Sequence, residues 1–167
     1  MAQIHALIEE LDRESATTRK LLERLPEPKL AWKPHTKSMA LGQLAWHVST
    51  IPQVLSTMLL KDSHDFSTGS LQPPLPATTR EILEGFERAL RTAKENLGTL
   101  DDGKAMTVFK ISMAGRPVLE APRIAIVRLI LLNHLIHHRG QLSVYLRLLD
   151  IPVPSIYGPS ADENPFK

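Results

Sequence analysis

The sequence predicts an all-α protein, a four-helix bundle formed by a single domain over residues 1–167. Apolar residues recur every three or four positions in four long segments, as they do along the buried face of amphipathic helices. These segments are about residues 2–25, 38–60, 79–97 and 122–149. A chain of 167 residues can bury a core, and 43% hydrophobic with 23% charged residues is ordinary for a globular domain.

The first two predicted helices are separated by a proline-containing linker. The apolar stripe of the first helix consists of Ile4, Leu7, Ile8, Leu11, Leu21, Leu22 and Leu25. Pro26 and Pro28 end this helix, because proline lacks a backbone donor and clashes inside a helix. Ser38 is a suitable N-cap for the second helix. The stripe of the second helix consists of Leu41, Leu44, His47, Val48, Ile51, Leu55 and Met58.

The second half of the chain is divided by turn signals. Residues 61–78 contain prolines and turn-forming residues, so we expect a loop there. Thr78 lies three residues before Glu81, the spacing of a capping box, and this predicts that the third helix begins at Thr79. The connection between the third and fourth helices is either a short hairpin within residues 106–120 or an extended crossover. Pro122 suits the first turn of the fourth helix.

The composition excludes several classes of function. The chain has 20 basic and 18 acidic residues without a dense basic cluster, so we expect no nucleic-acid partner. It has no cysteine, which excludes disulfides, thiolate metal ligands and a cysteine nucleophile. The N-terminus lacks a hydrophobic signal core, and the longest apolar run, residues 124–132, contains Arg128 and is too short for a bilayer. We therefore expect a cytoplasmic protein without a membrane partner.

Three histidines fall within five residues of the fourth predicted helix. His134 and His138 are four residues apart and project from one face, whereas His137 points about 100° away from His138. The rest of that face is mostly apolar, which indicates that it packs toward the core. An unpaired polar group in such a place costs about 1–3 kcal/mol. A divalent metal shared by the two imidazoles would satisfy them, and so would ordinary hydrogen bonds.

His47 is the candidate for a third ligand, because it lies on the apolar stripe of the second helix. Three neutral imidazoles around one divalent metal leave an open position for water or substrate, as catalytic sites require. Leu135 stands where a zinc peptidase of the H-E-x-x-H type has its glutamate, so peptide hydrolysis by that mechanism is not expected. The sequence thus predicts a metal site made of His47, His134 and His138.

The other conspicuous side chains have less specific roles. His5, His35 and His64 are expected at the surface, and His137 is either beside the ligands, at an interface or in solvent. Core packing is favoured for Trp32 and Trp46 over a place in a pocket wall. A C-terminal segment that folds back over the open end of the bundle would bring Tyr157, Asp162 and Glu163 near the site, and the sequence leaves this open.

Three segments resemble the DinB-like (YfiT-like) family of metal-dependent proteins. They are WKPHTKSMALGQLAWHV at residues 32–48, NHLIHHRGQLSVYLRLL at 133–149 and PSIYGPSADEN at 154–164. The resemblance implies a four-helix bundle that holds a divalent metal, often nickel or zinc, through three histidines. The matching positions are His47, His134 and His138, the residues that the helical faces also select. The resemblance further implies a homodimer.

The same resemblance suggests an activity, because relatives include thiol-dependent S-transferases and a mycothiol-dependent isomerase. We therefore expect a metal-dependent transferase, in which the metal activates a low-molecular-weight thiol as cosubstrate for attack on a small-molecule substrate. A metal-dependent hydrolase that uses metal-bound hydroxide is an alternative, as is a non-catalytic metal-binding stress-response protein. An all-imidazole site also accepts iron or manganese, so the residues alone do not select the metal.

Overall fold

The computed structural model of the chain describes residues 2–67 and 74–166. Most of these residues are helical, and the predominantly helical character predicted from the apolar stripes is confirmed. The helices are α1 (Ala2–Leu22), η1 (Glu27–Lys29), α2 (Leu41–Met58), α3 (Thr79–Gly98), α4 (Asp102–Met106), α5 (Arg123–Ile126), η2 (Val127–Leu132) and α6 (Asn133–Leu148).

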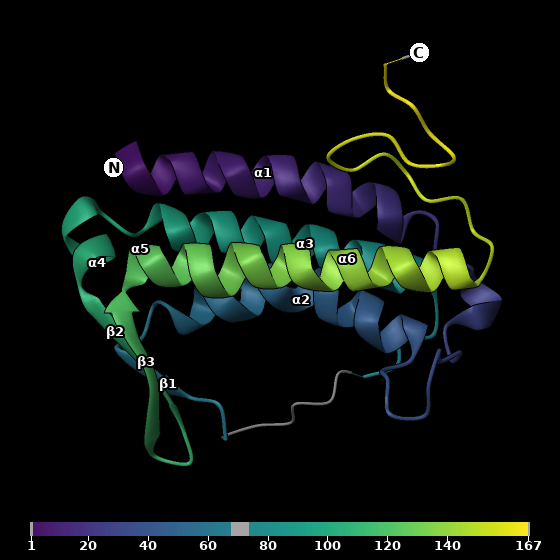
Figure 1. The fold of residues 1–167 in the computed structure, drawn as a ribbon. Coiled ribbons are helices and arrows are strands. Elements are labelled where there is room, and N and C mark those ends of the chain that lie inside the picture. The colour runs from purple at the N-terminus through teal and green to yellow at the C-terminus, as the bar shows by residue number, and fades with distance from the viewer. Residues whose placement is uncertain (1, 68–73, 167) are drawn as a thin grey trace.

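The long helices α1, α2 and α3 lie beside the continuous run formed by α5, η2 and α6 (Figure 1). Both α1 and α2 pack against α3 on one side and against α6 on the other. Their apolar stripes meet in a core whose buried members include Leu11, Leu21, Leu44, Val48, Phe86, Leu97, Leu135 and Leu142. This packing places α2 next to α6, the two helices that carry the predicted metal ligands.

The all-α prediction is wrong in one respect, because the described residues include a three-stranded sheet in the order β1-β2-β3. Strands β2 (Val108–Met113) and β3 (Arg116–Pro122) form an antiparallel hairpin, so the hairpin alternative is confirmed and the extended crossover is wrong. Ala114 and Gly115 make its turn with φ of 50° and 73°, the positive values that two-residue hairpin turns require. The hairpin projects from the end of the helices at which α4 and α5 lie (Figure 1).

Strand β1 (Ser63–Asp65) pairs in parallel with β2, within the segment predicted to be a loop. The loop prediction is therefore wrong at these residues. The sequence did not reveal the strand, because β1 is only three residues long and lacks the alternation of apolar and polar residues that marks a strand. It is held instead by the edge of β2 and by the Asp65 carboxylate, which accepts hydrogen bonds from the backbone N–H groups of Ala114 and Gly115 at 3.1 and 2.8 Å. Residues 68–73 of the predicted loop lie outside the described residues.

The start of α2 differs from the prediction, because Ala40 and not Ser38 is the N-cap. Backbone carbonyls replace a capping side chain here: the N–H groups of Leu41 and Gly42 donate to Trp32 O at 2.9 Å and to Leu30 O at 2.8 Å. A Cβ atom at Gly42 would lie 3.2 Å from the backbone oxygen of Leu30 and 3.1 Å from Leu30 Cβ, so this close approach of the two segments favours glycine. The loop before α2 is therefore hydrogen-bonded to the first turn of the helix that carries His47.

The start of α3 agrees with the prediction, since Thr78 is its N-cap and accepts a hydrogen bond from the Glu81 N–H at 3.1 Å. The fourth predicted helix is interrupted, because η2 is a π-helical segment between α5 and α6. At its end the Asn133 N–H donates to Arg128 O, five residues back. Such turns hold one extra residue and rotate the helix that comes after them, and here the rotated segment begins one residue before His134.

Candidate metal centre

His47, His134 and His138 come together between α2 and α6. One ligand nitrogen from each ring lies within 4.8 Å of the others. The Nε2 atoms of His47 and His134 are 3.2 Å apart. The ring centroid of His138 is 4.6 Å from that of His47 and 4.5 Å from that of His134. The interhelical contact thus brings His47 to a pair of residues that lie 87 and 91 positions further along the chain.

The three side chains are half-buried, at the border between the core and solvent. Leu131 at the end of η2, and Leu135 and Leu142 on α6, are buried close to the pair along the helix. On α2, Val54 lies seven residues, or about two turns, after His47, and its side chain is 57% exposed. The side of α2 that carries His47 therefore borders solvent, whereas the apolar members of the predicted stripe are buried. A ligand on this group would remain accessible from outside.

The surroundings keep all three imidazoles neutral near pH 7. Burial first, and then the charge that His138 would carry, lower the pKa of His47 from 6.5 to about 4. Burial and the neighbouring histidines lower the pKa of His134 to about 4 as well. The pKa of His138 is lowered chiefly by burial, although its hydrogen bond with Gln141 acts in the opposite direction. Neutral imidazole is the form of histidine that binds metal ions.

The donor set suits a divalent metal. Two nitrogens that bind one tetrahedral zinc ion at about 2.0–2.1 Å lie about 3.3 Å from each other. The 3.2 Å between the Nε2 atoms of His47 and His134 is close to that separation. Within residues 2–67 and 74–166 the group contains no carboxylate, so its donors are imidazoles only. Nickel, zinc and iron all accept imidazole ligands, and the donor set alone does not select among them.

The other histidines lie outside this group. His137 is exposed, and its ring centroid is 4.9 Å from that of His138, so it borders the group on the solvent side. His5 and His35 are exposed, as predicted. His64 was also expected at the surface, but it lies in β1, half-buried, with its ring against Phe66 at 4.8 Å. The pairing of β1 with β2 explains this difference.

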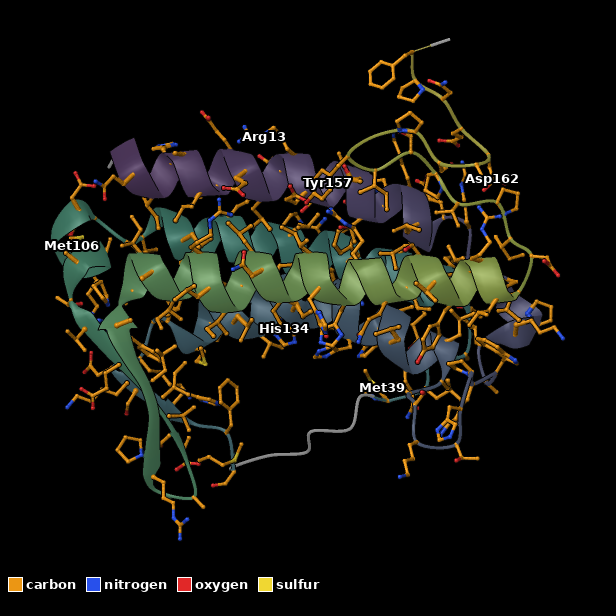
Figure 2. All side chains as sticks on the ribbon, in the orientation of Figure 1. Arg13, Met39, Met106, His134, Tyr157 and Asp162 are labelled. Carbon is orange, nitrogen blue, oxygen red and sulfur yellow. The ribbon has the colours of Figure 1, made fainter. Side chains whose placement is uncertain are left out.

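The C-terminal segment does not fold over the histidines. Tyr157 lies beside α1, on the side of α6 away from His134 (Figure 2). Its hydroxyl donates to Glu14 Oε2 at 2.7 Å and accepts from Arg139 Nη2 at 2.6 Å. Asp162 is ion-paired with Arg147, which also keeps that part of the segment on the outside of α6.

Two further residues are important to this region, and sequence reasoning assigned them no role. Arg139 is only 1% exposed, and its ion pair with Glu14 connects α6 to α1, whereas His134 and His138 on the same helix meet His47 of α2. The sequence signal was a charged residue next to a predicted core-facing position. Gln141, three residues after His138, places Oε1 at 2.7 Å from His138 Nδ1. The sequence shows that Gln141 is three residues from His138 and therefore close to it on a helix, but it does not show that the two side chains form a hydrogen bond.

A cavity of about 230 Å³ lies between α1 and α3 and is not lined by any of the histidines. The interhelical ion pairs Arg19–Glu87 and Lys94–Asp12 come from residues that line it. Because these pairs connect α1 with α3, whereas the histidines belong to α2 and α6, the cavity has no part in the metal group.

Comparisons with known proteins agree with this description. The model of the DinB family matches residues 1–165. The uncharacterized protein YrdA of Bacillus subtilis (strain 168) is 28% identical over 151 residues, which are 90% of this chain and 85% of YrdA. A DinB-like protein of Bacillus cereus ATCC 10987 has a similar fold, with a TM-score of 0.70 and 24% identity over 94% of this chain and 100% of that one.

A second solved structure, the DinB-like protein YjoA of Bacillus subtilis, superposes with a TM-score of 0.69 at 17% identity, over 90% of this chain and 97% of its own. Among the described helices, none combines the length and the apolarity needed to cross a membrane. The match of the family model over nearly the whole length, together with the helical fold and the three-histidine group, shows that the chain belongs to the DinB family.

Proposed function

We propose that the protein is a metal-dependent transferase in which His47, His134 and His138 hold one divalent ion, nickel or zinc, for the activation of a low-molecular-weight thiol. The observation that carries the proposal is the meeting of three neutral, half-buried imidazoles within 4.8 Å, without a carboxylate among the described members of the group. Family membership supports a metal-binding role for this group.

The chain's residues determine how strongly a bound ion would act. Three neutral imidazoles compensate none of its charge, whereas a carboxylate ligand would cancel part of it. When bound, the ion supplies a positive charge that favours the ionised form of a nearby thiol. The half-buried position of the three rings strengthens this electrostatic effect, because charges interact more strongly where water is partly excluded.

The proposed reaction transfers the thiol sulfur to an electrophilic carbon of a small molecule. The thiol proton passes to solvent, the sulfur forms a bond to the carbon, and the leaving group departs with the electrons of its former bond. The chain contains no cysteine, so the reacting sulfur is supplied from outside. We place the protein in the cytoplasm, where small thiols are kept reduced.

The experiment is a turnover assay with a model electrophile and glutathione, bacillithiol or mycothiol, using protein loaded with nickel or zinc. We expect thiol-dependent turnover by the wild type and its loss in His47→Ala. His137→Ala is the matched control, because His137 is exposed beside the group but is not a member of it. Retention of turnover by a His47→Ala protein that no longer binds metal would contradict the mechanism.

The same assay separates the alternative functions. Turnover that needs the metal but no added thiol would identify a hydrolase. Metal-dependent thermal stability without turnover of any electrophile would identify a non-catalytic binding protein, such as one used in a stress response. Neither alternative has an observation of its own in its favour, because both use the same three histidines.

A further inference from the structure

His138 differs from the other two histidines in what its second ring nitrogen contacts. Its Nδ1 atom lies 2.7 Å from Oε1 of Gln141, three residues further along α6. In the described part of the chain, the ring nitrogens of His47 and His134 have a hydrogen bond only with each other, between their Nε2 atoms. Among the described residues, no neighbour therefore orients the remaining nitrogen of either ring.

The hydrogen bond with Gln141 determines which nitrogen of His138 carries the proton. A carboxamide oxygen is only an acceptor, so Nδ1 of His138 must be the donor. In a neutral imidazole the other nitrogen, Nε2, then has a free lone pair. One ring nitrogen of His138 lies within 4.8 Å of a ring nitrogen of His47 and of His134. Because Nδ1 is engaged with Gln141, Nε2 is the nitrogen left to bind an ion in this group.

We propose that Gln141 is a positioning residue, which holds His138 in the Nδ1–H tautomer so that Nε2 is ready to bind a metal before the metal arrives. This inference rests on the proposed metal-binding function. No described side chain fixes the tautomer of His47 or His134 in the same way, because their Nε2 atoms face each other at 3.2 Å. If one of these Nε2 atoms carries a proton in the metal-free protein, that ring changes its tautomer before both atoms bind one ion, whereas His138 needs no such change.

The neutrality of Gln141 matters for the proposed chemistry. Metal-binding histidines commonly donate their other N–H to a carboxylate, a carbonyl or water, and loss of that partner typically weakens metal affinity about 10–100-fold. A carboxylate in this place would add a negative charge next to the group. A carboxamide also orients the ring, and it leaves the charge of a bound ion uncompensated, which favours an ionised thiol. Gln141 is exposed, so it has this role without supporting the core.

The first test is the tautomer of His138 in metal-free protein, read from long-range ¹H–¹⁵N correlations of the imidazole rings. We expect the Nδ1–H form in the wild type and a loss of that preference in Gln141→Leu. Gln53→Leu is the matched control, because Gln53 is an exposed glutamine on α2, and it should leave the His138 signals unchanged. An Nε2–H tautomer of His138 in the wild type would overturn the inference.

The second test is the affinity for nickel and zinc by calorimetry. Gln141→Leu should weaken binding about 10–100-fold, Gln141→Glu should bind at least as tightly as the wild type, and Gln53→Leu should be unchanged. Equal affinity of Gln141→Leu and the wild type would overturn the role of Gln141 and leave the metal centre intact. Failure of every protein, including the wild type, to bind metal would instead overturn the proposed function, and this inference with it.

Discussion

At the residue scale, Asp65 shows how one side chain connects three parts of the sheet. Its carboxylate accepts hydrogen bonds from Ser67, from the Ser112 hydroxyl and from the backbone N–H groups of Ala114 and Gly115. These donors, the Ser67 hydroxyl above all, hold the pKa of Asp65 well below its usual range. The ionised carboxylate is thus part of the structure of the hairpin turn.

We predict that Asp65→Asn lowers the melting temperature at pH 7 and reduces the loss of stability in acid. The unfolded carboxyl titrates near pH 3.9, and the folded one titrates lower. The stabilisation is therefore complete above about pH 5 and is lost as the pH falls through 3.9 toward the folded pKa. Thermal melts followed by circular dichroism at pH 7, 5 and 3 measure the effect.

Asp12→Asn is the control for this prediction, because Asp12 belongs to α1 and makes an ion pair with Lys94 of α3 instead of contacting the hairpin turn. It should leave the acid dependence of the wild type nearly unchanged. If Asp65→Asn melted at the wild-type temperature at pH 7, the hydrogen bonds to Asp65 would not stabilise the sheet.

At the element scale, the long helices could be predicted because their apolar stripes repeat every three or four residues over many turns. The shorter or irregular elements could not. The segment that forms η2, VRLILL, is apolar at all but one position, so its pattern does not reveal an extra residue in the turn. Ser38 had the chemistry of an N-cap, but backbone carbonyls of Leu30 and Trp32 occupy the first N–H groups of α2.

Those features of the candidate site that depend on the residue spacing within a single helix could be predicted from the sequence. The four-residue spacing placed His134 and His138 on one face, and the apolar stripe placed His47 toward the core. The 3.2 Å contact between His47 and His134 depends on how α2 packs against α6, which no local pattern encodes. Likewise, the position of the C-terminal segment depends on distant partners such as Glu14 and Arg24.

At the scale of the whole molecule, α6 has an apolar surface that nothing covers among the described residues of the single chain. Val144 and Leu148 are 56% and 57% exposed and lie one turn apart. Gly140 precedes them by one turn, and a Cβ atom there would meet nothing within 4 Å. A helix of a second copy can approach closely at such a place, and we propose that the homodimer implied by the family resemblance forms through this surface.

We predict a mass close to twice 18.7 kDa in size-exclusion chromatography with light scattering. Val144→Lys should produce a monomer, because it places a charge in the middle of the proposed contact. Val118→Lys is the control, since Val118 is 64% exposed on β3 and should not affect the mass. A monomeric wild type would contradict the proposal, and an unchanged mass for Val144→Lys would exclude α6 as the contact.

The central claim is that His47, His134 and His138 together hold one divalent metal ion. The most direct measurement is the metal content of protein purified without chelators, determined by elemental analysis for the wild type, His134→Ala and His137→Ala. We predict about one divalent ion per chain for the wild type and for His137→Ala, and almost none for His134→Ala. A wild type without metal that also fails to take up nickel or zinc, or a His134→Ala protein that keeps its metal, would contradict the account.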